Sequence, residues 1–279
     1  GSVIDFAKLI KIGLTQSSQN LEKIVKGLIK PKDPSIPFVA VPTTAGSGSE
    51  ATHFAVCYIE GEKFSVADNF LRPDINILDS KTLNSLPSYV KKSSALDCIS
   101  QAIESLWAVS GTQESRLLAA ESLTIGLANL DNYLRKKSSV CHQKMMIAAN
   151  LAGQAINISK TTAAHAFSYK IAQELQISHG HAVWHTLPTI FRIHFRKRKK
   201  ITQKLHFDAM GTLLEIIEKS KKNFADDVCL EEIFSLTGLQ KMWPRNYQDF
   251  NKIIKSVNLE RLENNPIQFY KDELQEIFF

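Results

Sequence analysis

Ser93-Ser-Ala-Leu-Asp97-Cys-Ile-Ser-Gln101-Ala-Ile-Glu104 begins the part of the chain on which the predicted fold depends. Asp97, Gln101 and Glu104 are spaced i, i+4 and i+7, so they share one face of a predicted helix. Two later pieces also place potential metal ligands among apolar or small residues: Lys160-Thr-Thr-Ala-Ala-His165-Ala-Phe-Ser-Tyr169 and His179-Gly-His181-Ala-Val-Trp-His185. One carboxylate and two imidazoles can bind a divalent metal and leave a position open for substrate. Such residues are more often satisfied core or surface groups, so a metal site needs support from the rest of the chain.

The sequence on either side of Pro87 predicts different secondary structure. Before it, the pattern predicts a helix that opens at Gly1 and strands over 36–42, 54–59, 63–66 and 74–79, the middle two forming a hairpin. After it, apolar residues at helical spacing predict helices near 91–107, 113–135, 142–156, 161–174 and 206–222, with shorter ones over 229–237, 247–256 and 269–279. We therefore expect an α/β domain over 1–87 and an all-helical domain over 88–279, as suits a chain of 279 residues.

The composition argues against several classes of protein. Lys and Arg number 34 against 28 for Asp and Glu, and the net charge of +6 favours an anionic small molecule as readily as nucleic acid. Much of the excess lies in 196–200, which we expect to be a solvated loop or helix end, because no aromatic partners for nucleic acid accompany it. The four cysteines show no paired spacing, which fits a reducing cytoplasm. No apolar run reaches about 18 residues, so no membrane span is expected.

A loop of small residues follows the first predicted strand. Thr43-Thr-Ala-Gly-Ser-Gly-Ser-Glu50 lets the backbone approach a ligand, and its hydroxyls and amides offer donors to a phosphate or a ribose. A plain tight loop would have the same composition. The helix that opens at Gly1-Ser2 offers a second site for an anion at its N-terminus.

Together these motifs resemble the iron-containing (group III) alcohol dehydrogenase superfamily. Pro42-Thr-Thr-Ala-Gly-Ser-Gly-Ser-Glu50-Ala-Thr52 is similar to its cofactor loop, and Gly1-Ser2-Xaa-Xaa-Asp5 to the end of its glycine-rich pyrophosphate loop. The resemblance implies a partial Rossmann-like cofactor domain before a helical-bundle metal domain, the dehydroquinate synthase-like architecture. It implies Fe²⁺ or Zn²⁺, NAD or NADP, and a homodimer. The cofactor residues that it implies are Gly1, Ser2, Asp5, Thr43, Thr44, Gly46, Ser47, Gly48 and Lys63.

The same resemblance implies that Asp97, His165 and His179 bind the metal. The usual fourth ligand of the superfamily is a histidine, and its place is taken here by Gln101, whose neutral carbonyl oxygen is a weaker ligand. The site is therefore expected to use three ligands and water, or to include Gln101. His181 and His185 compete as ligands, and we expect them to support or pack against the site instead.

Further motifs resemble the phosphonoacetaldehyde reductase branch, namely Glu50-Ala-Thr-His-Phe-Ala-Val56, Gln101-Ala-Ile-Glu-Ser-Leu-Trp107 and Ala155-Ile-Asn-Ile-Ser-Lys-Thr-Thr162. That branch implies reduction of phosphonoacetaldehyde to 2-hydroxyethylphosphonate. Lys160, Thr161 and Thr162 would bind the phosphonate, although the threonines could simply cap a helix and the lysine could be solvated. Tyr169, in place of a histidine that many members carry, would donate a proton or merely pack.

Three alternatives remain open at this point. The chain could be a general alcohol dehydrogenase for small alcohols, a lyase of the dehydroquinate synthase type, or a truncated relative without catalysis. The cofactor domain of the superfamily begins well before the residue that matches Gly1, so its front, which chooses between NAD and NADP, is expected to be missing here.

Overall fold

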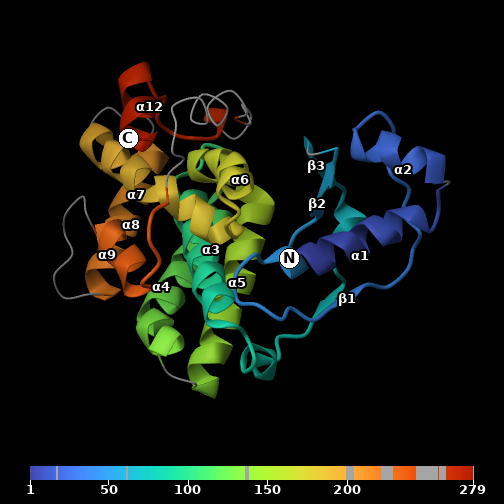
Figure 1. Ribbon diagram of the computed structural model, residues 1–279, viewed down its shortest axis with the longest axis horizontal. Helices are drawn as coiled ribbons and strands as arrows, with labels where there is room; N and C mark the ends of the chain where they lie inside the picture. The colour runs from blue at the N-terminus through green and yellow to red at the C-terminus, as the bar shows by residue number, and fades with distance from the viewer. Residues whose placement is uncertain are drawn as a thin grey trace.

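The chain folds into a small α/β part and a larger helical bundle that lie side by side (Figure 1). This computed structural model describes residues 1–16, 18–60, 62–135, 138–198, 204–220, 229–242, 257 and 262–278. The predicted helix over 247–256 lies outside the described residues. Within them, no helix is long and apolar enough to cross a membrane.

The α/β part contains two helices and two small sheets. Helix α1 (Ser2–Gly13) packs on the hairpin of β2 (Phe54–Ile59) and β3 (Glu62–Ala67), and α2 (Ser18–Val25) contacts β3. The second sheet pairs β1 (Val39–Ala40) with β4 (Ile75–Asn76) in parallel. The hairpin forms as predicted, but β1 and β4 are shorter than the predicted 36–42 and 74–79, and α2 was not predicted. Short 3₁₀ helices cover Ser49–Ala51, Asn69–Leu71 and Ser80–Leu83.

A small hydrophobic cluster holds the α/β part together. Ile12 of α1, Ile24 and Val25 of α2, Val66 of β3 and Leu71 form it. The outer faces remain apolar yet exposed: Val3 and Phe6 of α1 are 82% and 64% exposed, and Leu14, directly after α1, is 61% exposed. On the second sheet, Val39, Val41, Ile75 and Ile77 are exposed as well. Several exposed apolar side chains on one element are typical of a face that packs against further protein.

The helical bundle is built around α3 (Ser88–Trp107). Every residue of α3 from Ala95 to Trp107 is buried, because this helix is apolar or small on nearly all sides and α4, α5, α7 and α8 pack around it. The helices of the bundle follow in order as α4 (Gln113–Arg135), α5 (Ser139–Ser159), α6 (Ala163–Leu175), α7 (His179–Lys197), α8 (Lys204–Ser220), α9 (Cys229–Leu236) and α12 (Lys271–Phe278). Apart from α7, which was not predicted as a helix, they agree with the predicted helices to within a few residues at each end.

Two glycines of the small-residue loop let the two parts approach closely. A Cβ on Gly46 would lie 2.8 Å from the Cα of Ser94 in α3. A Cβ on Gly48, whose φ is +59°, would lie 2.5 Å from the Cα of Gly153 in α5. Real side chains cannot reach such distances, so both positions require glycine. The loop is thus pressed against α3 and α5, which fixes its position beside the polar face of α3.

A buried lysine ties α1 to the segment after this loop. The Lys8 ammonium is fully buried and lies 2.7, 2.9 and 2.9 Å from the carbonyl oxygens of Ser49, Thr52 and Phe54. It also lies 3.3 and 3.1 Å from the Ser49 and Thr52 hydroxyls. Burial lowers the pKa of Lys8 to about 8, although Asp5 and Glu50 oppose the shift. One cation therefore organises most of the backbone from residue 49 to residue 54.

Candidate metal centre and adjoining cavity

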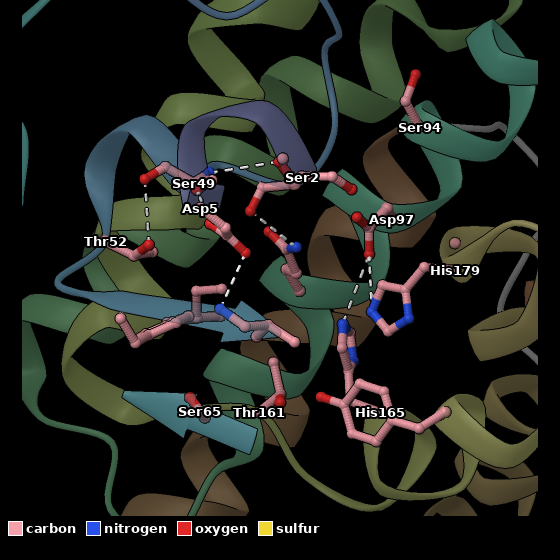
Figure 2. A pocket seen from close by; sticks show the side chains of 18 of the residues that line it. Ser2, Asp5, Ser49, Thr52, Ser65, Ser94, Asp97, Thr161, His165 and His179 are labelled. Carbon is pink, nitrogen blue, oxygen red and sulfur yellow. Dashed lines mark hydrogen bonds and ion pairs between the residues drawn. The ribbon is translucent and has the colours of Figure 1, made fainter. Parts of the chain in front are cut away.

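Asp97, His165 and His179 meet at one point, although they come from α3, α6 and α7 (Figure 2). Nε2 of His165 lies 3.6 Å and Nε2 of His179 lies 3.8 Å from Oδ1 of Asp97. One potential ligand atom from each residue lies within 4.8 Å of the other two. Asp97 and His165 are buried, whereas the His179 side chain is 38% exposed. The structure therefore brings together the carboxylate and both imidazoles that the sequence singled out.

The hydrogen bonds of this cluster favour a cation between its members. Oδ1 of Asp97 and Nε2 of His165 are buried and have no hydrogen-bond partner among the described residues. The Ser168 hydroxyl donates its proton to the His165 carbonyl at 2.9 Å, so it can only accept from Nδ1 of His179, 3.4 Å away. That assigns the proton of His179 to Nδ1 and a lone pair to Nε2. A carboxylate oxygen and imidazole lone pairs that face one another repel without a cation, so these residues fit a divalent metal.

Glu104 supports the cluster from behind, a role that the sequence reasoning missed. Its carboxylate is fully buried, and Oε2 accepts a hydrogen bond from Nδ1 of His165. Oε1 accepts from the Thr162 hydroxyl at 2.6 Å and from the Ala164 amide at 2.9 Å, so the same carboxylate caps the N-terminus of α6. A carboxylate behind a ligating histidine fixes its tautomer and its ring orientation. The i, i+3 spacing of Gln101 and Glu104, which places both on one face of the helix, was the sequence signal that could have indicated this role.

The charges of the cluster depend on one another. Burial disfavours both ionised carboxylates, yet the neighbouring histidines outweigh it and lower the pKa of Asp97 and of Glu104. Burial also disfavours the His165 imidazolium, but Glu104 and Asp97 outweigh it and raise the pKa of His165. Two buried carboxylates thus create a site that attracts positive charge, whether from protons or from a metal.

A cavity of about 700 Å³ extends from this cluster along the boundary between the two parts of the chain. That volume suits a small molecule and part of a larger one. The α/β part contributes Ser49, Thr52, His53, Phe54 and Ser65, and the bundle contributes Ile156, Asn157, Tyr169 and Gly180, beside the metal cluster. Substrate and cofactor could therefore meet next to the metal cluster in one cavity.

The expected cofactor residues divide into two groups. Gly1, Ser2, Asp5, Thr44 and Ser47 line the cavity, whereas Thr43, Gly46 and Gly48 do not. A Cβ on Gly46 or Gly48 would meet α3 or α5, so the packing of the loop already requires these glycines, and their contact with a cofactor stays a prediction. The side chain of Lys63 lies outside the described residues. Asp5 accepts hydrogen bonds from the Ser49 hydroxyl and from the Val56 amide, so it holds the loop and the hairpin together.

Gln101 lies at the edge of the metal cluster. Its amide nitrogen donates to the Ser47 carbonyl at 3.2 Å, which leaves its buried carbonyl oxygen without a partner among the described residues. Tyr169 lines the cavity and stacks on His179, with ring centroids 5.4 Å apart and planes at 9°. A hydroxyl near the cluster and an unpaired amide oxygen are thus both present in the cavity.

The expected substrate residues do not all reach the cavity. Lys160 and Thr161 line it. Thr162 does not, because its hydroxyl accepts a hydrogen bond from Trp107 at 2.9 Å and donates to Glu104. Thr162 helps to secure the helix cap through Glu104, and its contact with substrate stays a prediction. It is the N-cap residue of α6 by position, yet its own side chain makes no capping bond.

Comparison with known proteins decides the family. Residues 91–279 match the C-terminal part of the Fe-containing alcohol dehydrogenase family, and residues 1–80 match the iron-containing alcohol dehydrogenase model. The chain belongs to the iron-containing alcohol dehydrogenase family. The superfamily expected from the sequence is thereby confirmed.

Relatives within the iron-containing alcohol dehydrogenases are considerably longer. "Probable alcohol dehydrogenase EutG" of Escherichia coli (strain K12) is 31% identical over 68% of this chain and 48% of its own length. Phosphonoacetaldehyde reductase of Streptomyces viridochromogenes is 32% identical over 57% of this chain and 41% of its own length. The chain thus spans about half the length of the curated relatives it matches.

A solved structure establishes the fold. Sulfoacetaldehyde reductase from Bifidobacterium kashiwanohense, in complex with NAD⁺, superposes with a TM-score of 0.86 over 99% of this chain and 73% of that protein, at 23% identity. The expected fold class, α/β plus all-α, is confirmed.

The two remaining histidines of the α7 motif face away from the metal cluster. His181 lies 3.2 Å from the Tyr89 hydroxyl and 2.9 Å from the Gln240 carbonyl oxygen. Nε2 of His185 accepts from the Met242 amide at 2.9 Å, and burial lowers the pKa of His185 to about 4. Both rings attach the C-terminal segment to α7.

Proposed function

We propose that this protein reduces a small aldehyde with NADH or NADPH, using Fe²⁺ or Zn²⁺ bound by Asp97, His165 and His179. The observation that carries the proposal is the convergence of their ligand atoms within 4.8 Å at a cavity, with Oδ1 of Asp97 and Nε2 of His165 buried and unpaired among the described residues. We propose Gln101 as a weak fourth ligand, because it follows Asp97 by one helical turn and its buried carbonyl oxygen has no partner among the described residues. The match to the iron-containing family favours the reductase over a lyase of similar architecture.

When bound, the metal would act as a Lewis acid toward the aldehyde oxygen. The chain itself performs three tasks in this proposal. Glu104 keeps the proton of His165 on Nδ1, so that Nε2 remains a lone-pair donor. The Tyr169 hydroxyl is the candidate proton donor to the alcohol oxygen, from a ring held by stacking on His179. The cavity aligns the reactants, which lowers the entropic part of the barrier.

We propose that the cofactor lies on the α/β side of the cavity. Gly1 and Ser2 begin α1, and a helix N-terminus favours a negatively charged pyrophosphate. Asp5, Thr44 and Ser47 line the adjoining wall. The exposed apolar faces of α1 and of the β1–β4 sheet support the view that residues 1–87 are part of a larger cofactor domain, and that 88–279 form the metal domain.

The finer proposal is that the aldehyde is phosphonoacetaldehyde. Support comes from the resemblance to phosphonoacetaldehyde reductases and from Lys160 and Thr161, which line the cavity near His165. A general alcohol dehydrogenase for small neutral alcohols is the second candidate, and the match to EutG favours it. A relative without catalysis is the third. We also propose that this enzyme is a homodimer and that it is located in the cytoplasm.

Metal analysis and a coupled assay test the proposal. The purified protein should contain one divalent metal per chain and should oxidise NADH or NADPH when given phosphonoacetaldehyde or propanal. His179→Ala should lose both metal and activity, whereas His142→Ala, a histidine of α5 buried away from the cluster, should retain the metal. Stoichiometric metal in the His179 variant would contradict the ligand assignment. Metal without aldehyde reduction would favour the relative without catalysis.

A further inference from the structure

His179 is the first residue of α7, so its position depends on how that helix begins. The first hydrogen bond within the helix runs from the Ala182 amide to the Ser178 carbonyl oxygen, at 3.0 Å. The amides before Ala182 have no partner inside the helix, and the first turn of a helix frays unless other groups hold it. The His179 side chain is also the most exposed of the three proposed ligands. The start of α7 therefore has to be held in place for His179 to meet the other ligands.

The usual cap is missing from α7. In an N-cap, the side chain of the residue before the helix accepts a hydrogen bond from the amide of the second or third helical residue. Here that bond would join the Ser178 hydroxyl to the Gly180 or His181 amide, yet the Ser178 side chain makes no capping bond. The Ser178 hydroxyl donates instead to the hydroxyl oxygen of Ser93, at 2.7 Å. The acceptor for the start of α7 must therefore come from another element.

Helix α3 supplies that acceptor. The hydroxyl oxygen of Ser93 accepts from the His181 amide at 3.1 Å, in addition to the bond from Ser178. Ser93 is buried, so the loss of its hydroxyl would leave the His181 amide short of a partner. One helical turn before Ser93, the Tyr89 hydroxyl accepts from the Ser178 amide at 3.0 Å. Two side chains of α3 thus cap α7 in trans.

The Tyr89 hydroxyl also donates its proton within this network. Nε2 of His181 lies 2.9 Å from the Gln240 carbonyl oxygen, which can only accept, so Nε2 is the donor. Nδ1 of neutral His181 then accepts from the Tyr89 hydroxyl, 3.2 Å away. Tyr89, Ser93, Ser178 and His181 therefore form one connected hydrogen-bond network between two helices, which we call the α3–α7 clasp.

The clasp lies directly beside the metal cluster. Tyr89, Ser93 and Asp97 follow one another at steps of four residues, so they lie along one side of α3. A Cβ on Gly180 would lie 2.1 Å from the Ser93 carbonyl oxygen and 2.8 Å from the Cβ of Asp97. The start of α7 therefore touches α3 at the turn that carries Asp97. Any shift of this start would change the 3.8 Å separation between Nε2 of His179 and Oδ1 of Asp97.

We infer that Ser93 and Tyr89 of α3 cap α7 in trans and thereby position His179 for the metal. This inference rests on the metal centre of the proposed function and adds residues that the ligand set does not contain. Neither side chain belongs to the proposed ligands, so both are positioning residues. Without the clasp the first turn of α7 frays, and the bound metal has to order it again, which weakens the apparent affinity.

The decisive experiment compares two buried serines. Ser93→Ala should weaken Zn²⁺ binding to the metal-free protein by about 2- to 30-fold in competition with a chelator, the scale of a lost N-cap. It should also speed amide hydrogen exchange over residues 179–185. Ser122→Ala is the matched control, because the buried Ser122 hydroxyl donates to the Ala148 carbonyl oxygen at 2.7 Å and joins α4 to α5. It should lower stability in urea to a similar degree yet leave Zn²⁺ affinity and this exchange unchanged.

Two further variants distinguish a cap in trans from an ordinary one. Ser178→Ala should weaken Zn²⁺ binding less than Ser93→Ala, because the acceptor for the His181 amide remains. In Ser93→Ala the freed Ser178 hydroxyl can turn toward that amide, so Ser93→Ala/Ser178→Ala should show the largest loss. The visible absorption of bound Co²⁺, which reports ligand geometry, should change in the double variant and not in Ser122→Ala.

Three results would overturn the inference: a larger loss in Ser178→Ala than in Ser93→Ala, an equal loss in Ser122→Ala, or wild-type affinity in the double variant. The wild type is measured in parallel. A wild type that binds no stoichiometric Zn²⁺ would contradict the proposed metal centre itself. Stoichiometric Zn²⁺ in the wild type, with the same affinity in the double variant, would contradict only the role of the α3–α7 clasp.

Discussion

Replacing Glu104 with glutamine tests the metal centre without altering any proposed ligand. The substitution preserves size, and the amide oxygen can still accept from Thr162 and Ala164, so the cap of α6 survives. The amide nitrogen, however, would face Nδ1 of His165, from which the carboxylate now accepts a hydrogen bond. His165 would then favour the tautomer with its proton on Nε2, the atom that faces Asp97. A protonated Nε2 cannot bind a metal.

The expected effect is a loss of about 10- to 100-fold in metal affinity, the usual cost of removing a partner behind a ligating histidine. The assay is titration of the metal-free protein with Zn²⁺ against a competing chelator, with a thermal melt to confirm folding. Glu114→Gln, at an exposed position in the first turn of α4, is the control and should bind Zn²⁺ normally. Affinity in Glu104→Gln equal to that of the wild type would refute the role assigned to the His165–Glu104 contact.

Helical periodicity explains why so much of the bundle was predictable. The i, i+4 and i+7 spacing in α3 gave both the helix and the shared face of Asp97 and Gln101, because side-chain direction follows directly from helix geometry. The pairing of His165 with His179 came from resemblance, since no local rule relates residues on two different helices. The lengths of strands β1 and β4 were overpredicted. Apolar residues next to them suggested longer buried strands, but several of these residues are exposed, and a sequence pattern does not show which residues are covered.

The loop between β1 and β2 shows where local reasoning fails. Its small residues suggested space for a ligand, and the need for small residues was correct. Gly46 lies against Ser94, about 50 residues later in the sequence, and Gly48 lies against Gly153, about 100 residues later. The local sequence could therefore not identify the group that approaches the loop. Glu104 was missed for a related reason, since a buried carboxylate acquires its role only from the helix that packs above it.

Three further predictions concern single residues outside Glu104. Asp97→Ala should abolish stoichiometric metal in elemental analysis, while Gln101→Ala should weaken binding less, because a neutral amide is the poorer ligand; equal losses would contradict that order. Gly46→Val should lower the free energy of unfolding by about 1–3 kcal/mol in urea, because its side chain would collide with Ser94, and unchanged stability would contradict the close packing. Lys8→Met tests the buried ammonium through pH. Because burial lowers the pKa of Lys8 from 10.5 to about 8, the unfolded chain holds a proton that the folded protein has lost between those values. The unfolding free energy of the wild type relative to Lys8→Met should therefore be constant below about pH 8 and rise by about 3 kcal/mol toward pH 10.5, measured by urea denaturation. A difference that falls with pH would show instead that the five oxygen atoms around the ammonium stabilise its charge more than burial opposes it.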